Sequence, residues 1–472
     1  MQRPARPSVE DSVPQLTGVN MRRCAMARRH HWVKAAKTRL HLICSMALVC
    51  ALCCLGANCL RRAPAPASDD EITLVYWSAT NAQELEFARR VADEWNARQA
   101  KMRVRVEPVP AGQSSEEVIL AALASRTTPD IYANAFPGAM QDLLDAEGVV
   151  RLDDFADFSS VLRARMSADM LAQYRSPDGH FYQLPWKSNP IMVLYNMRLL
   201  REAGSDRPPR DYAEFLQIAA RVTKDADGDR RPDHWMIAID YLPIWYKRMF
   251  DFYPLYLAAS GGAPLIEHGR VKFDNEAAAA VFRFTRELFA RGYAPRQSFQ
   301  GDPFLQGRIA ARFTGPWSIS QIERYAPAGF EYAFGPIPRP EATDEPTVSY
   351  ADPKSIVIFR TCRHPQAAWE FVKFIVSKEN DRLLLEMTNQ LPIRADLLSD
   401  PIFSDYFARH PGMIQFAQLL PAARSVESVA ELKEIFDIIA QEFEASVVFG
   451  LKTPERAIHD AARRSQAIID AD

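Results

Sequence analysis

Residues 308–338 read RIAARFTGPWSISQIERYAPAGFEYAFGPIP, and this segment carries the clearest indication of the fold. A short apolar run over residues 309–313 predicts a strand, and a helix is expected to begin at about Ser318. Between them stands the tripeptide Gly315-Pro316-Trp317. Because Gly-Pro interrupts regular structure, it delivers the tryptophan to the point where the strand gives way to the helix. Ligands bind at this edge of open α/β sheets, so Trp317 is either a ligand-binding residue or an ordinary core tryptophan.

Strand and helix signals alternate from residue 72 onward. Residues 72–77 (ITLVYW) form an apolar run typical of a buried strand, and residues 102–107 alternate apolar and charged side chains at strand spacing. Between these runs, apolar residues recur at helical spacing. This order is a βαβ unit, which predicts a parallel sheet. The helix is expected to start at one of two capping boxes, Asn81 with Glu84 or Thr80 with Gln83.

Residues 181–196 (FYQLPWKSNPIMVLYN) form a proline-containing apolar segment that ends in Tyr195-Asn196. Together with the Gly-Pro-Trp element, this segment resembles the extracellular solute-binding proteins of ABC importers, in the sugar-binding group that includes the maltodextrin-binding proteins. In that family the segment carries the chain from one lobe to the other. The order and spacing of such motifs match the family over nearly all of residues 70–470.

The resemblance implies an α/β, two-lobed, periplasmic-binding-protein-like fold of type II. Each lobe would be a mostly parallel sheet flanked by helices, with the ligand cleft between the lobes. Residues 69–187 and about 348–396 would form the first lobe. Residues from about 188 to 347 and from 397 to 472 would form the second, behind a separate segment at residues 1–68.

Two expected strand ends carry side chains suited to a sugar. Trp77 closes the first strand, and Asn134 and Phe136 follow the strand expected at residues 129–132. An aromatic ring covers the C–H face of a sugar while an amide bonds its hydroxyls, so these three residues are candidate ligand contacts. Trp77 fits a core position equally well.

The resemblance adds further candidates. It places a sugar ring on Trp317, and it puts Asn189 where some family members have a carboxylate that bonds sugar hydroxyls. Aromatic residues of the second lobe reach the family's cleft from a segment that corresponds to residues 242–262, and contacts often precede the strand expected at residues 355–359. The complete set of candidate ligand-binding residues is Trp317, Trp77, Asn134, Phe136, Trp186, Asn189, Trp245, Phe252, Tyr350 and Asp352.

The amino terminus indicates export. A basic stretch precedes the apolar residues 42–57, a run of sixteen residues that is short for a membrane span of about 20 but fits a signal-peptide core. The run ends before Cys59 in a sequence that resembles a lipoprotein cleavage site, although Gly56 and Asn58 depart from the usual pattern. Lipidation of Cys59, an uncleaved anchor and cleavage near residues 65–67 are the alternatives. The Pro/Ala-rich residues 61–68 would then tether the body.

The charge of the body excludes one class of partner. Beyond residue 62 the chain holds 46 Lys and Arg against 57 Asp and Glu, a net charge of about −11. Proteins that bind nucleic acid carry basic patches, so a nucleic-acid partner is not expected.

The acidic segment at residues 225–233 was considered as a calcium site. Asp225, Asp227, Asp229 and Asp233 match loop positions 1, 3, 5 and 9, but position 6, which requires glycine, is Arg230. No glutamate stands at position 12. The sequence therefore favours a plain surface turn and predicts neither a metal nor a cofactor.

The expected function is non-enzymatic capture of a mono- or oligosaccharide and its delivery to the transmembrane subunits of an ABC permease. An exported glycoside hydrolase is the first alternative, since paired carboxylates leave no recognisable spacing. No G-x-S-x-G, H-E-x-x-H or phosphate-loop motif is present. A binding protein for another solute, such as a peptide, polyamine or metal, is the second alternative.

Overall fold

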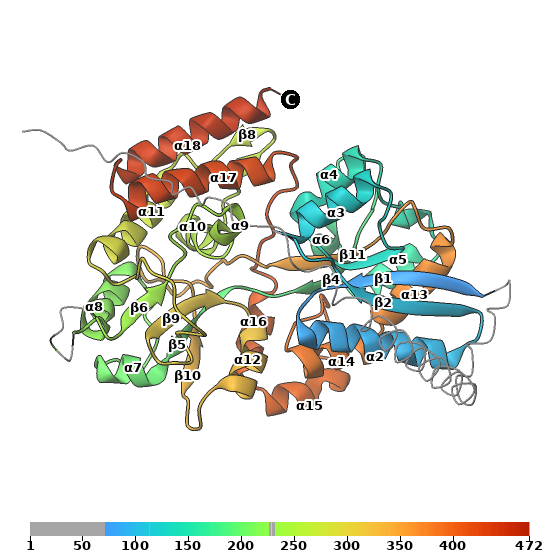
Figure 1. The fold of residues 1–472 in the computed structure, drawn as a ribbon, viewed down its shortest axis with the longest axis horizontal. Helices are drawn as coiled ribbons and strands as arrows, with labels where there is room; N and C mark the ends of the chain where they lie inside the picture. The colour runs from blue at the N-terminus through green and yellow to red at the C-terminus, as the bar shows by residue number, and fades with distance from the viewer. Residues whose placement is uncertain (1–70, 113, 226–227, 229–231, 472) are drawn as a thin grey trace, which may run out of the picture. The chain divides into compact units, whose positions relative to one another are not determined.

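The computed structural model describes residues 71–112, 114–225, 228 and 232–471, which belong to one compact unit. Two sheets organise this unit (Figure 1). The first has the strand order β2-β1-β3-β11-β4 and the second the order β10-β5-β9-β6. An α/β fold with two helix-flanked sheets is thereby confirmed. The lobe boundaries stay predictions.

The strands are β1 (Ile72–Ser78), β2 (Met102–Pro108), β3 (Ile131–Ala135), β4 (Leu184–Ser188), β5 (Met192–Asn196), β6 (Trp235–Ala238), β7 (Ile266–Glu267), β8 (Arg270–Val271), β9 (Ile309–Thr314), β10 (Tyr332–Gly335) and β11 (Pro353–Ile358). The helices are α2 (Ala82–Arg98), α3 (Ser115–Ala124), η1 (Pro137–Ala139), α4 (Met140–Asp145), η2 (Leu152–Asp154), α5 (Phe158–Arg163), α6 (Ala168–Ala172), α7 (Met197–Glu202), α8 (Tyr212–Val222), α9 (Trp245–Arg248), α10 (Phe252–Ser260), α11 (Glu276–Ala290), α12 (Trp317–Tyr325), α13 (Pro365–Ile375), α14 (Lys378–Thr388), α15 (Pro401–Arg409), α16 (Gly412–Leu419), α17 (Leu432–Phe443), η3 (Glu444–Val448) and α18 (Pro454–Ile469).

Both sheets are mixed, whereas mostly parallel sheets were expected. In the first sheet β1 pairs in parallel with β2 and β3, but β11 runs antiparallel to both β3 and β4. In the second sheet only the pair β6 and β9 is parallel among the described strands. The antiparallel partners arise because β11 and β5 each follow a passage of the chain from one sheet to the other, which reverses the direction of entry.

The chain passes between the sheets in two segments that lie against each other. It leaves the first sheet after β4 and joins the second at β5, and it returns after β10 to form β11. The amide of Asn189 donates to the carbonyl of Ala351 at 2.6 Å, and that of Ile191 donates to the carbonyl of Tyr350 at 2.9 Å. We call residues 189–191 and 349–352 the crossing segments.

The two faces of the first sheet are both buried, and neighbouring residues of a strand serve opposite faces. Tyr76 belongs to the cluster formed with α2, α13 and α14, whereas Trp77 belongs to the cluster formed with α3 and α4. Trp77 is 8% exposed, and its indole N–H donates to Glu107 at 3.2 Å. The continuous apolar run of β1 is thus explained by helices on both sides.

The second sheet is covered by a larger core that includes α10, α11 and α17. The aromatic segment at residues 242–262 contains two helices, α9 and α10, and Asp251 caps the second. Arg248 is fully buried and pairs with Asp251 at 2.9 Å.

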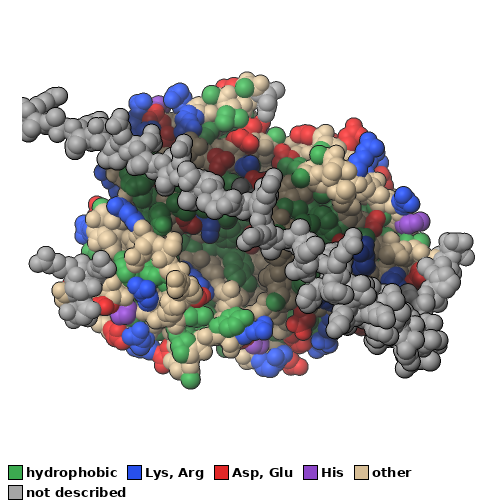
Figure 2. Space-filling view, viewed as in Figure 1, with side chains coloured by type: hydrophobic (Ala, Val, Ile, Leu, Met, Phe, Trp, Pro, Cys, Tyr) green, Lys and Arg blue, Asp and Glu red, His purple; other side chains and the backbone are tan. Residues whose placement is uncertain are grey.

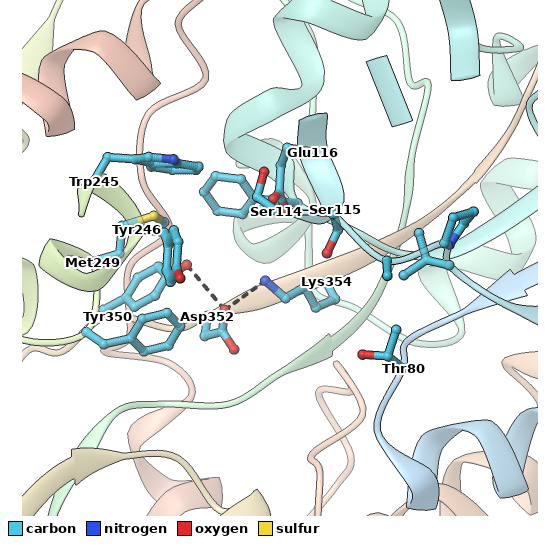
Figure 3. Close-up of a pocket in the computed structure, with 16 residues that line it drawn as sticks. Thr80, Ser114, Ser115, Glu116, Trp245, Tyr246, Met249, Tyr350, Asp352 and Lys354 are labelled. Carbon is cyan, nitrogen blue, oxygen red and sulfur yellow. Dashed lines mark hydrogen bonds and ion pairs between the residues drawn. The ribbon is translucent and has the colours of Figure 1, made fainter. Parts of the chain in front are cut away.

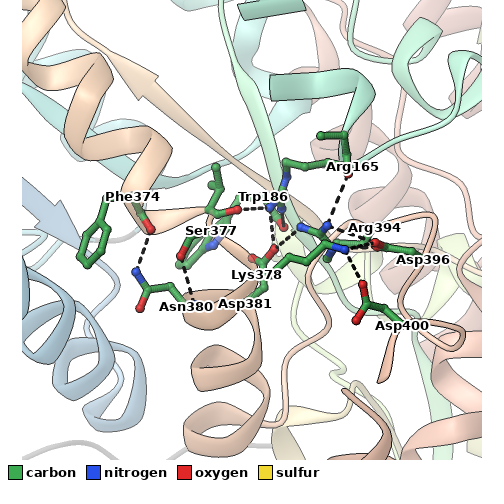
Figure 4. Close-up of polar contacts among 12 residues, drawn as sticks. Arg165, Trp186, Phe374, Ser377, Lys378, Asn380, Asp381, Arg394, Asp396 and Asp400 are labelled. Carbon is green, nitrogen blue, oxygen red and sulfur yellow. Dashed lines mark hydrogen bonds and ion pairs between the residues drawn. The ribbon is translucent and has the colours of Figure 1, made fainter. Parts of the chain in front are cut away.

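A buried ionic cluster fixes the chain that follows β11 (Figure 4). Asp381 is fully buried and accepts hydrogen bonds from Arg165 at 2.5 Å and from Arg394 at 3.0 Å. Arg394 also pairs with Asp396, which Lys378 contacts from the other side at 2.9 Å. Burial of Asp381, Arg165 and Arg394 is tolerated because each has an opposite partner.

Several expectations for the amino terminus concern residues outside the described ranges. These are the signal segment, lipidation at Cys59 and the tether at residues 61–68. Within the described ranges, no helix combines the length and apolarity needed to cross a bilayer. The cysteine of the body, Cys362, is buried and unpaired.

We predict that Glu427 makes stability fall as pH rises. Its Oε2 is buried without a hydrogen-bond partner, and burial raises the pKa of the carboxyl group from 4.5 to about 7. The unfolded chain ionises first, so stability present below pH 4.5 is lost as pH rises through about 7. Glu427→Gln should therefore gain about 3 kcal/mol over the wild type at pH 8 and little at pH 4. Urea melts across this range measure the difference.

The exposed Glu86→Gln on α2 serves as the control for the Glu427 variant. Its stability difference from the wild type should not change with pH. An equal difference for Glu427→Gln at pH 4 and pH 8 would show that the buried carboxyl group ionises as it does in the unfolded chain.

Candidate functional site

Cavities open beside the crossing segments. Two adjoining cavities, of about 570 Å³ and about 320 Å³, form what we call the central cleft, a size that suits a small ligand. They share Thr80, Val109, Ser115, Asp352 and Lys354. A side cavity of about 760 Å³ adjoins the central cleft at Tyr246, Phe250, Trp317 and Gln321. Figure 2 shows hydrophobic side chains gathered in the hollow at the middle of one face.

One wall of the central cleft comes from the carboxyl ends of parallel strands, where α/β sheets bind ligands. Thr80 follows β1, Val109 follows β2, and Asn134 lies near the end of β3. Asn134 has a φ of 127°, a conformation that L-residues rarely adopt and that is concentrated at functional sites. Ser115 and Glu116 join this wall from the first turn of α3.

The floor is the second crossing segment (Figure 3). Asp352 accepts a hydrogen bond from the Tyr350 hydroxyl at 3.3 Å and pairs with Lys354 at 2.9 Å. Burial opposes the charged form of Lys354, but the carboxylates of Asp352 and Glu116 outweigh this and raise its pKa. Asp352 itself has a φ of 37°, a second strained backbone position at the cleft.

The opposite wall is aromatic and belongs to the second sheet's side of the molecule. Trp245, Tyr246 and Phe250 come from α9 and the turn after it, and Trp317 begins α12. Phe250 packs edge-on against Trp317 at 6.3 Å and against Tyr350 at 5.8 Å between ring centroids. Trp245 and Tyr246 meet edge-on at 5.8 Å. Each of these four side chains is partly exposed, so ring faces remain open to a ligand.

The Gly315-Pro316-Trp317 element has a specific geometric role. A Cβ on Gly315 would lie 2.1 Å from the Trp317 ring, so only glycine lets the indole fold back over the end of β9. Pro316 stands at the N-cap of α12 with φ −63°, which its ring favours. The element therefore places the first side chain of the helix against the cleft.

A buried hydrogen-bond network supports the cleft where α2 begins. Asn81 caps α2, which identifies the capping pair, and the Glu84 carboxylate accepts from its side-chain amide at 2.8 Å. Glu84 also accepts from Gln390 at 2.6 Å and from Lys187, a residue 1% exposed. Burial disfavours the Glu84 anion, but Lys187 and the two amides lower its pKa below the ordinary value. Glu84 and Gln390 thus present fixed polar groups to the cleft.

The structure brings six of the ten sequence-predicted ligand residues to these cavities. The six are Trp317, Asn134, Phe136, Trp245, Tyr350 and Asp352. Tyr350 is buried as a residue and contributes to the cavity floor.

The other four lie in the packed interior and line none of these three cavities. Trp77 faces α3 and α4, as described above. Trp186 is 1% exposed and packs against Phe87, with Lys187 over its ring. Phe252 is fully buried and stacks with Tyr256, and the Asn189 amide is occupied by Gln390 and Leu391.

Several lining residues carried weak sequence signals. Tyr246 and Phe250 lie within the aromatic segment at residues 242–262, and Lys354 is two positions after Asp352. Glu84 was assigned to a capping box, and this assignment gave no indication that its carboxylate also lines the cleft. Gln390 and Glu116 had no distinguishing pattern, because only the fold brings them to the cleft.

No cluster of three or more His, Cys, Asp or Glu side chains within the described ranges is arranged to hold a metal ion. The acidic segment considered for calcium lies partly outside those ranges, at residues 226–227 and 229–231. In the part that is described, the Gly228 amide donates to Asp225 at 2.6 Å, a local turn contact.

Comparison with known proteins places this geometry in context. Residues 90–411 match a family model described as bacterial extracellular solute-binding protein. The maltotriose-binding protein of Pyrococcus abyssi is 22% identical over 364 residues, which cover 75% of this chain and 74% of that protein. The sn-glycerol-3-phosphate-binding periplasmic protein UgpB of Pectobacterium atrosepticum is 21% identical over 309 residues, covering 62% and 67%.

A solved structure shows the same fold. The sugar-binding protein MalE of Xanthomonas citri superposes with a TM-score of 0.68 at 19% identity, covering 84% of this chain and 98% of that one. At this identity the likeness concerns the fold alone.

We predict that Lys187→Met destabilises the protein by about 3 kcal/mol, because it leaves the Glu84 carboxylate buried without its cation. Adding Glu84→Gln should restore much of the loss, since no buried charge then remains. Lys378→Met, which removes a partly exposed lysine from Asp396 and Asp400, is the matched control and should cost under about 1 kcal/mol. Urea denaturation measures all four proteins. A double variant less stable than Lys187→Met would contradict the electrostatic account.

Proposed function

The chain belongs to the bacterial extracellular solute-binding protein family, a family of binding proteins rather than enzymes, and from this we propose that it captures a carbohydrate in the central cleft. The captured mono- or oligosaccharide would be delivered to the transmembrane subunits of an ABC importer. Closure of the two halves about the crossing segments would enclose it.

The observation that carries this proposal is the aromatic wall facing polar strand ends. Trp245, Tyr246, Phe250 and Trp317 offer ring faces on one side of the cleft. Asn134, Ser115 and Asp352 offer hydrogen-bonding groups on the other side and on the floor. A sugar presents a C–H face and an array of hydroxyls, and it needs both kinds of surface at once.

The charge of the cleft favours a carbohydrate over a phosphate ester. Among the described residues that line the central cleft, Lys354 is the one basic side chain, and it is paired with Asp352. Phosphate recognition calls for uncommitted cationic groups or several backbone amides. An sn-glycerol 3-phosphate ligand, as named for one relative, is therefore the less favoured candidate, whereas the maltotriose named for another fits the surface.

The family is extracellular, which agrees with the export signal expected at the amino terminus. We propose that the amino-terminal segment, through Cys59 or as an uncleaved anchor, holds the protein at the outer face of the membrane. A tethered receptor would stay close to its permease and pass ligand on without diffusing away.

We predict that Trp317→Ala weakens carbohydrate binding by roughly thirtyfold, since a stacked ring loses about 2 kcal/mol of contact. Thermal shift with a panel of neutral and amino-substituted oligosaccharides, amino acids and glycerol phosphate first identifies the ligand class. Calorimetric titration then compares the variant with the wild type.

Tyr325→Ala is the matched control for the Trp317 variant. Tyr325 is the last residue of α12 and is 63% exposed, and it lines neither the central cleft nor the side cavity. Its loss should leave affinity unchanged. Stabilisation by phosphate esters or amino acids with no response to any carbohydrate would overturn the proposal.

A further inference from the structure

The acidic and basic side chains that line the central cleft do not balance. The side chains that line its larger cavity and carry a charge at neutral pH are Glu116, Asp352 and Lys354. Asp352 and Lys354 form an ion pair at 2.9 Å, whereas Glu116 has no basic group within ion-pair distance among the described residues. In the adjoining cavity the additional carboxylate, Glu84, is already matched by Lys187 behind it. The three charged groups of the larger cavity therefore sum to one negative charge, because Lys354, whose pKa Glu116 also raises from beyond ion-pair distance, is the direct partner of Asp352.

An ordinary surface carboxylate would need no explanation, because water solvates it. Glu116 differs because it borders a cavity that the proposed binding would fill and close. A carboxylate that loses water without gaining a partner costs several kcal/mol. A ligand that supplies a positive charge at this point would remove that cost, and a neutral ligand would not.

Aromatic rings border the same place. Trp245 and Phe136 line the larger cavity together with Glu116, and Figure 3 shows Trp245 and Glu116 entering it from different elements. Aromatic ring faces attract organic ammonium groups, and a carboxylate beside them adds a charge-assisted hydrogen bond. The Phe136 ring already faces one ammonium group, the Nζ of Lys354 at 5.1 Å. Trp245 remains available to a second.

The neighbouring crevice adds further negative charge at this end of the cleft. Beyond Glu116, Phe136 and Trp245 the cleft continues into a crevice of about 440 Å³, in which Lys433 is the one basic side chain among the described lining residues. Its acidic lining residues are Glu116, Glu117, Asp142, Asp145 and Glu434. Burial and the carboxylates of Glu434 and Asp145 raise the pKa of Asp142, as expected where negative charge is crowded. Such a field attracts cations to this end of the cleft.

We propose that the natural solute is a carbohydrate that carries a protonated amino group, and that Glu116 receives this group beside Trp245. This inference rests on the proposed function and narrows it from sugars in general to amino sugars or their oligomers. Glu116 acts as the specificity residue, while Trp317 and the strand ends bind the sugar rings whatever their substituents.

The test is calorimetric titration of the full chain at neutral pH with three matched series: short glucosamine oligomers, their N-acetylated counterparts and short glucose oligomers. Spermidine, a polyamine without a sugar ring, is titrated separately. The glucosamine series should bind about tenfold or more tightly than the other two, the value of one charge-assisted hydrogen bond. Glu116→Gln should abolish that preference while leaving the melting temperature unchanged. Glu117→Gln, the neighbour paired with Lys433 at 3.2 Å, should keep it.

The outcomes separate this inference from the function on which it rests. Equal or tighter binding of the neutral or N-acetylated series, or a preference that survives Glu116→Gln, would overturn the amino-sugar assignment and leave carbohydrate capture intact. Binding of simple polyamines without any sugar would show that the site reads charge alone, which contradicts both. Absence of binding by all three series would overturn the amino-sugar assignment, whereas carbohydrate capture is overturned only if the wider carbohydrate panel also gives no response.

Discussion

The pairing of the two crossing segments is the constraint on which the rest of the molecule depends. Residues 189–191 and 349–352 are joined by backbone hydrogen bonds, and Ser349 adds a side-chain bond to the carbonyl of Ile191 at 2.6 Å. Arg424 bonds to this pair through its backbone, so the chain that leads into α17 is tied to the same place. The floor of the cleft is thus also the joint between the two sheets. A ligand that contacts Asp352 contacts the part about which closure would occur.

This arrangement explains why energetically unfavourable features, namely strained backbone and buried charge, lie near the crossing segments. Asp352 and Asn134 both adopt positive φ, and the Glu84 and Lys187 pair is buried a short distance along the chain from the first crossing. Strained backbone and buried charge each destabilise a fold unless neighbouring contacts hold them. Here the neighbours are hydrogen bonds from segments far apart in sequence, such as that from Gln390 to Glu84. Polar groups at the cleft are therefore held in place before any ligand arrives.

Much of the fold could be predicted from the sequence, because its signals are local. The strand at residues 309–314, the Gly-Pro interruption and the helix from Trp317 follow from periodicity and backbone chemistry. Strand direction could not be predicted with the same success, since it depends on where the chain crosses between sheets. The residues of the site also fall into those that a local pattern indicates and those that only the fold brings together. Trp77 is a residue type that suits a ligand contact. Side chains alternate between the two faces of β1, however, and this alternation places Trp77 on the face covered by α3 and α4. Glu116 and Gln390 had no local signal at all.

The central claim is that a carbohydrate binds between the aromatic wall and the strand ends. A crystal structure of the protein with a saturating short oligosaccharide tests it most directly. We expect a sugar ring stacked on the Trp317 indole, with its hydroxyls within hydrogen-bond distance of Asp352 or Asn134. A sugar bound outside the central cleft, or one inside it that leaves the Trp317 ring uncovered, would contradict the account.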